Sequence, residues 1–211
     1  MRRLGLTLAL AAVAAVPAPA SAARPKGCHP QGSSTVVANA RTRVFRWHRL
    51  VYGCLRKLGH PYALTSNDGY GFDKLRFVKP VLAGRYVAWA FYWESSVEGY
   101  GYGVRSMDLR NGGLSLTEFD ATLSGEPEKA VVSRLVLTPG GSYAWTWTID
   151  YKDHQAKELR KVEPNRKPTP KYPELGALVD SGDDLDLMSL TRDGSTISWL
   201  RGGSPQSQPL T

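Results

Sequence analysis

The sequence predicts an all-β protein in which about four short antiparallel sheets are stacked. The main observation is a hairpin phrase that occurs three times, at residues 82–89, 137–145 and 190–199. Each copy has an apolar strand end, a turn that contains Gly, and a second strand that carries a Trp. Glycine accepts the positive φ of tight hairpin turns, and the Asp-Gly pair at Asp193 is a strong hairpin signal. Repetition at such intervals indicates a blade or array architecture.

The second observation is that β-branched and aromatic residues dominate the runs between turns, as is typical of strands. In the first half of the chain the strands are expected at 35–40, 42–47, 49–55, 62–65, 75–82, 86–93, 104–109 and 114–119. The Gly at position 84 marks the turn before residue 86, and a Gly-Gly pair marks the turn before residue 114.

A polar connection at 124–129 precedes the second half, where strands are expected at 131–137, 143–149, 156–162, 177–179, 187–190 and 196–201, followed by a polar tail. Residues 153–162 have some helical character, but Pro164 limits a helix there, so we assign a strand. A loop rich in Pro and Lys follows at 164–173. These elements group into four units, 41–74, 75–124, 130–174 and 176–211.

Alternation along the strands predicts which side chains share a face. Trp89, Phe91 and Trp93 lie on one side of their strand, and small residues such as Ala88 lie on the other. Small residues suit a close approach of two sheets, whereas large aromatic residues fill wider gaps. One repeat position is expected to be core in every unit and is occupied by Tyr52, Trp89, Trp145 and Trp199.

The first 22 residues have the pattern of a secretory signal peptide. Arg2 and Arg3 precede an apolar run at 4–16, and Ala20-Ser21-Ala22 offers a cleavage site. The apolar run has 13 residues, whereas a membrane span needs about 20. We therefore expect a secreted protein, extracellular or on the cell-envelope side, with a tail at 23–34 and a single β domain at 35–211.

The mature chain is moderately basic, because removing two Arg from 27 basic residues leaves 25 against 19 acidic residues, a net charge of +6. Such an excess suits contact with anionic cell-wall polymers or lipid headgroups, and it also suits plain solubility. The basic residues are scattered rather than gathered into one run, which favours solubility.

The chain has two cysteines, Cys28 and Cys54, and both lie in the exported part. An oxidising compartment and an even count favour a disulfide between them. Two free thiols or a pair of metal ligands are the alternatives. Only His29 and His48 lie nearby, at a spacing that is unusual for zinc, so the structural disulfide is favoured.

The sequence shows no catalytic motif, cofactor fingerprint or metal-ligand spacing, so we predict no catalytic residue, metal or cofactor. The acidic residues at 180–186 lack the order of a calcium loop and indicate a solvated turn. Asp73 and Glu94 lie beside aromatic residues and are the candidates for a glycosidase carboxylate pair, which needs a defined separation of two acids.

The phrase at 137–145, Leu-Thr-Pro-Gly-Gly-Ser-Tyr-Ala-Trp, resembles the Ser-Pro-Asp-Gly hairpin of TolB-like and WD40-like β-propeller repeats. Residues 86–117 resemble one whole blade, with Asp108 where such repeats place an Asp before the last turn. The resemblance covers 35–211 and implies a small secreted bacterial protein with a propeller-like stack. Strand 35–40 is then expected to close the last sheet, because an unpaired edge invites aggregation. A β-sandwich is the alternative.

Two segments are candidate binding sites. Residues 94–103 are expected to form a loop that presents Tyr100 and Tyr102 beside Trp93 and Glu94, since exposed tyrosines bind with little loss of entropy. An ordinary hairpin loop is an equal alternative. The other segment is the basic Pro-rich loop, with Arg160, Lys161, Arg166, Lys167 and Lys171, for which a solvated loop is favoured.

Together these observations predict a secreted, non-enzymatic binding or scaffold module that recognises a protein or an envelope polysaccharide. A small extracellular hydrolase acting on glycans, with Glu94 among its acids, is the alternative. A purely structural role in the envelope also remains open. Nucleic acid is not an expected partner, because the chain is exported and has no recognised reading motif, and no integral membrane segment is expected after signal cleavage.

Overall fold

The computed structural model describes residues 24–65, 74–95, 99–120, 129–163 and 176–210. Within these ranges the chain is all-β and forms four small antiparallel sheets, as the sequence predicts. No helix in the described ranges has the length and apolar character needed to cross a bilayer. The connection expected at 124–129 and the Pro-rich loop at 164–173 lie almost wholly outside the described residues.

Each sheet follows the chain order of its strands or the reverse of it. Sheet 1 contains β1 (Ser34–Ala38), β2 (Thr42–Trp47), β3 (Leu50–Leu55) and β4 (His60–Ala63). Sheet 2 contains β5 (Lys74–Ala83), β6 (Tyr86–Ser95), β7 (Gly99–Asp108) and β8 (Gly113–Asp120). Sheet 3 contains β9 (Lys129–Leu137), β10 (Tyr143–Asp150), β11 (Gln155–Val162) and β12 (Ala177–Ser181). Sheet 4 contains β13 (Leu185–Asp193), β14 (Thr196–Arg201) and β15 (Ser204–Pro209).

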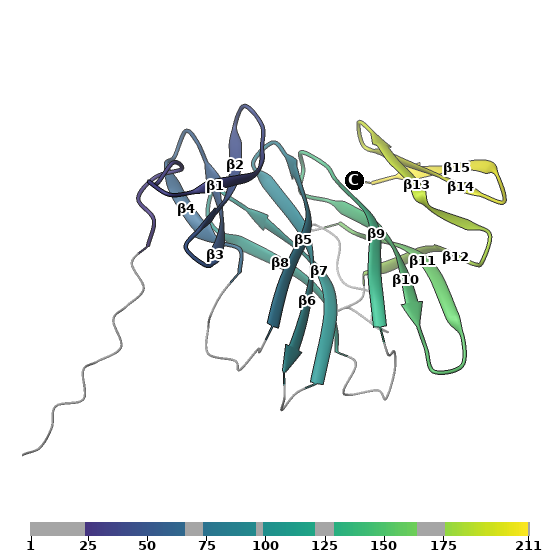
Figure 1. The fold of residues 1–211 in the computed structure, drawn as a ribbon. Coiled ribbons are helices and arrows are strands. Elements are labelled where there is room, and N and C mark those ends of the chain that lie inside the picture. The colour runs from purple at the N-terminus through teal and green to yellow at the C-terminus, as the bar shows by residue number, and fades with distance from the viewer. Residues whose placement is uncertain (1–23, 66–73, 96–98, 121–128, 164–175, 211) are drawn as a thin grey trace, which may run out of the picture.

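The sheets stack in chain order, each packing on the next through a buried apolar layer (Figure 1). Trp89 of sheet 2 packs with Val44 and Val51 of sheet 1. Trp145 of sheet 3 packs with Ala88 and Val104 of sheet 2, and Trp199 of sheet 4 packs with Ala144 and Leu159 of sheet 3. The predicted core role of this repeat position is therefore confirmed, as is the placement of small residues opposite large aromatic ones.

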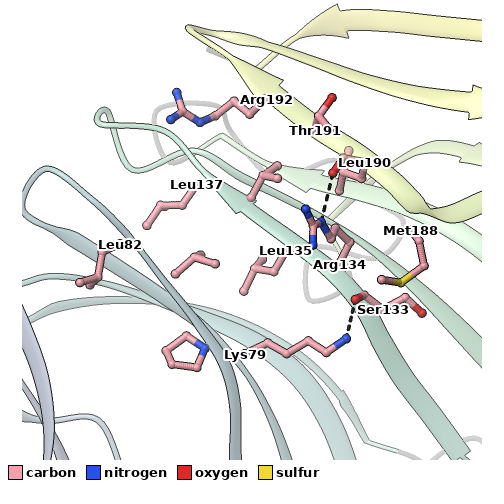
Figure 2. Close-up of a pocket in the computed structure, with 13 residues that line it drawn as sticks. Lys79, Leu82, Ser133, Arg134, Leu135, Leu137, Met188, Leu190, Thr191 and Arg192 are labelled. Carbon is pink, nitrogen blue, oxygen red and sulfur yellow. Dashed lines mark hydrogen bonds between the residues drawn. The ribbon is translucent and has the colours of Figure 1, made fainter. Parts of the chain in front are cut away.

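The first strand of each sheet is an edge strand, and these four strands adjoin one another: β1 contacts β5, β5 contacts β9, and β9 contacts β13. We call them the inner strands. Each has a break in its pairing register, at Val36, at Lys79–Pro80, at Ser133 and at 187–190. Such bulges protect an edge from pairing with another chain. Side chains tie neighbouring inner strands together, because Lys79 donates to the Ser133 carbonyl and Arg134 to the Leu190 carbonyl (Figure 2).

The prediction that strand 35–40 closes the last sheet is wrong, because β1 pairs with β2 in sheet 1. The cause is local. Asn39 Oδ1 accepts hydrogen bonds from the backbone N–H groups of Arg41 (2.9 Å) and Thr42 (2.8 Å), which turns the chain straight back as an Asx turn does. Sheet 4 instead obtains its third strand from 204–209, through the positive-φ pair Gly202-Gly203. The sequence-based prediction assigned that segment to a polar tail.

The predicted boundary between the third and fourth units, at 174–176, also differs from the structure. The strand at 177–181 pairs with β11 and so completes sheet 3 rather than starting sheet 4. Arg160 fixes this arrangement by donating from Nη1 to the Gly176 carbonyl at 3.2 Å. Gly176 has a φ of 69°, and an added Cβ there would lie 2.9 Å from the Trp145 ring. Only glycine suits this entry into β12.

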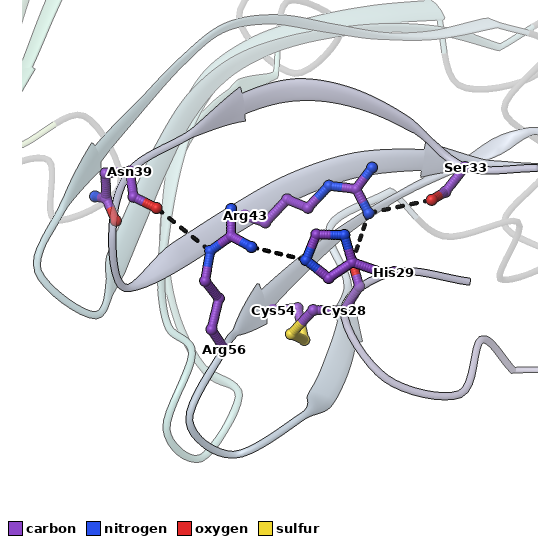
Figure 3. Close-up of a disulfide and its surroundings, with 7 residues drawn as sticks. All are labelled: Cys28, His29, Ser33, Asn39, Arg43, Cys54 and Arg56. Carbon is purple, nitrogen blue, oxygen red and sulfur yellow. Dashed lines mark hydrogen bonds between the residues drawn. A yellow bond between two sulfur atoms is a disulfide. The ribbon is translucent and has the colours of Figure 1, made fainter. Parts of the chain in front are cut away.

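The outer face of sheet 1 has no preceding sheet, and the N-terminal tail covers it (Figure 3). The predicted Cys28–Cys54 disulfide is present and joins the tail to β3. Both sulfurs belong to an apolar cluster with Phe45 and Tyr52. The buried Arg43 guanidinium lies over the Phe45 ring and donates to the Cys28 carbonyl at 2.5 Å. Burial, and then the nearby Arg56, lower the pKa of Arg43.

Replacing both cysteines, as C28A/C54A, should lower the free energy of unfolding by about 3 kcal/mol, the entropy of closing a loop of this length; the two residues are 26 positions apart. Guanidinium chloride denaturation measures this loss. Trypsin should then cut faster after Lys26, because the tail is released. Reduction of the unmodified protein is the control and should give the same loss. Unchanged stability in both cases would contradict a stapling role.

Candidate functional site: the groove between the inner strands

Of the four residues predicted as a binding site, Trp93 and Tyr102 are buried in different layers. Trp93 is 3% exposed and lies in the layer between sheets 1 and 2. Tyr102 is 6% exposed and lies in the layer between sheets 2 and 3, on the opposite face. The backbones of Glu94 and Tyr100 pair with each other across β6 and β7, whereas their side chains lie outside the part that the structure describes. The prediction of a loop at 94–103 is therefore wrong for 94–95, which belong to β6, and for 99–103, which belong to β7.

The alternating glycines of this segment accommodate aromatic side chains from the neighbouring strand. Gly101 pairs with Trp93 and Gly103 with Phe91. A Cβ added at Gly101 would lie 2.4 Å from the Trp93 indole, so only glycine leaves room for that ring. The alternating glycines are explained by the register of β6 and β7, in which Gly101 and Gly103 face large rings.

The other predicted charged segments are occupied by internal contacts where the structure describes them. Arg160 pairs with Glu158 at 2.6 Å, and Lys161 pairs with Glu163 at 2.7 Å; residues 166, 167 and 171 lie outside the described ranges. In the acidic segment, Asp180 accepts from the Trp199 indole at 2.6 Å. Among the described residues no group of three or more His, Cys, Asp or Glu could hold a metal ion.

A groove of about 680 Å³ lies between β5, β9 and β13, at the centre of the stack (Figure 2). Residues 79–82 and 133–137 line it consecutively, together with parts of 188–192. Successive side chains of a strand point to opposite faces, so an uninterrupted run of lining residues means that strand edges, not faces, form the walls. Seven of the 13 lining residues are aliphatic: Val81, Leu82, Leu135, Val136, Leu137, Met188 and Leu190. Of these, Leu135, Leu137 and Leu190 are buried, so the accessible aliphatic surface comes from the other four.

Three basic side chains line the groove: Lys79, Arg134 and Arg192. Each donates one hydrogen bond to a backbone carbonyl. Lys79 donates to the carbonyl of Ser133, Arg134 to that of Leu190 at 3.4 Å, and Arg192 to that of Gly194 at 2.6 Å. None of them forms an ion pair with a described residue. An ammonium has three N–H donors and a guanidinium has five, so each retains donors for a ligand.

Lys79 owes its place to a backbone irregularity. It has a φ of 49°, which is uncommon for a residue with a side chain, and it stands with Pro80 in the register break of β5. A bulge redirects the side chain that it carries, and here the lysine crosses toward β9. The sequence-based prediction treated 75–82 as a regular strand. The Lys-Pro pair within it was the available signal, since proline in a strand marks an edge or a bulge.

The chemistry of the groove is that of an anion site with an apolar surface. None of the 13 described residues that line it is acidic, histidine or aromatic. It therefore supplies no proton-transfer group of its own and no ring on which a sugar could stack. It supplies positive charge, N–H donors and aliphatic contact area.

Comparison with known proteins adds no further guide, because no family model, curated protein or solved structure matches the chain. The resemblance to propeller repeats is carried by the hairpin motifs of the sequence.

A Gly101→Ala substitution should destabilise the protein by about 1–3 kcal/mol, the usual cost of overpacking, because the new methyl group would displace the Trp93 ring. Thermal unfolding followed by tryptophan fluorescence measures the loss. Gly140→Ala is the matched control, since a Cβ there would meet only Thr138 Oγ1 at 3.6 Å. Equal stability of the two variants would refute the packing role of Gly101.

Proposed function

We propose that the protein is an exported, non-catalytic binding module, and that its groove receives an acidic segment of a partner protein. The observation that carries this proposal is a set of three basic side chains that form no ion pair with any described residue and lie beside aliphatic surface. Charges of this kind, placed at a concave site, attract and orient a ligand of opposite sign. The disulfide supports the extracellular part of the proposal, because such bonds persist in oxidising compartments.

The aliphatic surface favours a protein segment over a polysaccharide. Met188, which is 61% exposed, and the half-buried Val81 and Leu82 offer contact area to aliphatic side chains, and such burial contributes roughly 25 cal/mol per Å². An acidic polysaccharide would satisfy the charges and leave this surface without a matching partner. In an extended peptide successive side chains point to opposite sides, so alternating acidic and apolar residues match a basic rim and an apolar floor.

The test uses a labelled peptide of about six alternating Glu and Leu residues, roughly 20 Å when extended. Fluorescence anisotropy should show binding that weakens as salt is added, because the contacts are charged. A K79Q/R192Q variant should bind about tenfold more weakly, since two charge contacts are removed. The same peptide with Gln in place of Glu should not bind.

The matched control is K129Q/K152Q, which removes two exposed lysines that lie outside the groove. This variant should bind the acidic peptide as the unmodified protein does. If both double variants bind equally well, the groove is not the site and the proposal fails.

A further inference from the structure

A second basic hollow, of about 440 Å³, lies where sheets 1, 2 and 3 meet at their hairpin turns. Four basic side chains line it: Arg41, Arg56, Lys57 and Arg85. Its other described lining residues are Ala40, Leu55, Gly84 and Pro139, so again no acidic residue is among them. The hollow is thus electropositive, with small and aliphatic residues between the charges.

Two of these basic residues are held firmly in place. Arg85 pairs with Asp108 at 2.9 Å and donates to the Tyr86 hydroxyl at 2.8 Å. Arg56 contacts His29 Nε2 at 2.7 Å, beside the disulfide (Figure 3). The remaining two, Arg41 and Lys57, are exposed and form no ion pair with a described residue. They are available to an external anion.

The hollow and the groove adjoin the same two hairpins. In the β5–β6 hairpin, Leu82 lines the groove and Gly84 lines the hollow. In the β9–β10 hairpin, Leu137 lines the groove and Pro139 lines the hollow. The tips of the hairpins nearly touch, since a Cβ added at Gly84 would lie 3.8 Å from that of Pro139. These tips form a ridge between the two basic sites, and Gly84 adds no side chain to it.

The walls of this path are fixed by contacts between sheets. Thr42, which is fully buried, donates from its hydroxyl to the Gly84 carbonyl at 2.7 Å and so joins sheet 1 to the β5–β6 turn. Gly84 has a φ of 59°, and glycine adopts such a positive φ more readily than other residues, so glycine is favoured at the ridge. A rigid path of this kind binds an extended ligand with little reorganisation of the protein.

We infer that the two sites act together, and that the partner segment is an extended acidic peptide that continues from the groove over Gly84 and Pro139 into the second hollow. This inference rests on the proposed function, because the groove holds the first part of the same ligand. Seven basic residues then line one path, of which Arg85 alone forms an ion pair with a described residue. Such a run of charge matches a ligand with repeated carboxylates better than a single small anion.

The test compares the short peptide with a longer one of about sixteen residues and the same alternating pattern, roughly 55 Å when extended. The longer peptide should bind at least tenfold more tightly, since linking two contacts raises the overall affinity. An R41Q/K57Q variant should remove most of this gain in affinity. It should also reduce the slope of log K against log salt concentration by about one to two, since two charge contacts are lost. The short peptide should bind this variant normally.

The outcomes separate the two proposals. In one outcome, R41Q/K57Q binds the long peptide as the unmodified protein does, whereas K79Q/R192Q binds both peptides more weakly. The extended path is then wrong and the groove remains the site. If K79Q/R192Q binds the short peptide with the same affinity as the unmodified protein, the proposed function itself fails. If an acidic polysaccharide of similar length binds more tightly than the long peptide, the assignment of a peptide ligand is overturned. K129Q/K152Q again serves as the charge-matched control.

Discussion

The structure depends on one packing constraint: each of sheets 2, 3 and 4 buries a tryptophan of its second strand against the sheet before it. Trp89, Trp145 and Trp199 all lie in such layers. A sheet with an apolar face must bury that face against another element, so each of these small sheets requires a neighbour. Because every sheet covers the one before it, the stack forms a continuous core although its sheets are separate hydrogen-bonded units.

A stack of this kind has two ends, and the first end needs a cover that is not a sheet. Tyr52 occupies the repeat position in sheet 1 and faces outward, where a preceding sheet would otherwise lie. The tail takes that place, held by the disulfide and by Arg43, whose guanidinium binds the Cys28 carbonyl. The disulfide therefore belongs to the same packing scheme as the tryptophans, and its stabilising effect is concentrated where the stack begins.

The candidate binding surface is also a consequence of stacking. Packing the sheets face to face brings their first strands together at the centre, with unpaired edges directed at one another. Bulges and basic side chains protect those edges from pairing with other strands. The same devices place Lys79 and Arg134 around an aliphatic groove. Protection of the edges and the proposed attraction of an acidic ligand would thus use the same residues.

The sequence by itself determined most of the strands, the hairpin turns and the buried repeat position, because these follow from alternation, turn residues and pairing between neighbours along the chain. It also indicated the disulfide, because the two cysteines form an even pair in a chain expected to be exported. It missed β15 and assigned β1 to the wrong sheet. Only the tertiary structure decided that Trp93 and Tyr102 are core residues on opposite faces, and that Lys79 meets a carbonyl 54 residues away. No local pattern records which edges of separate sheets meet, since that depends on how the sheets pack.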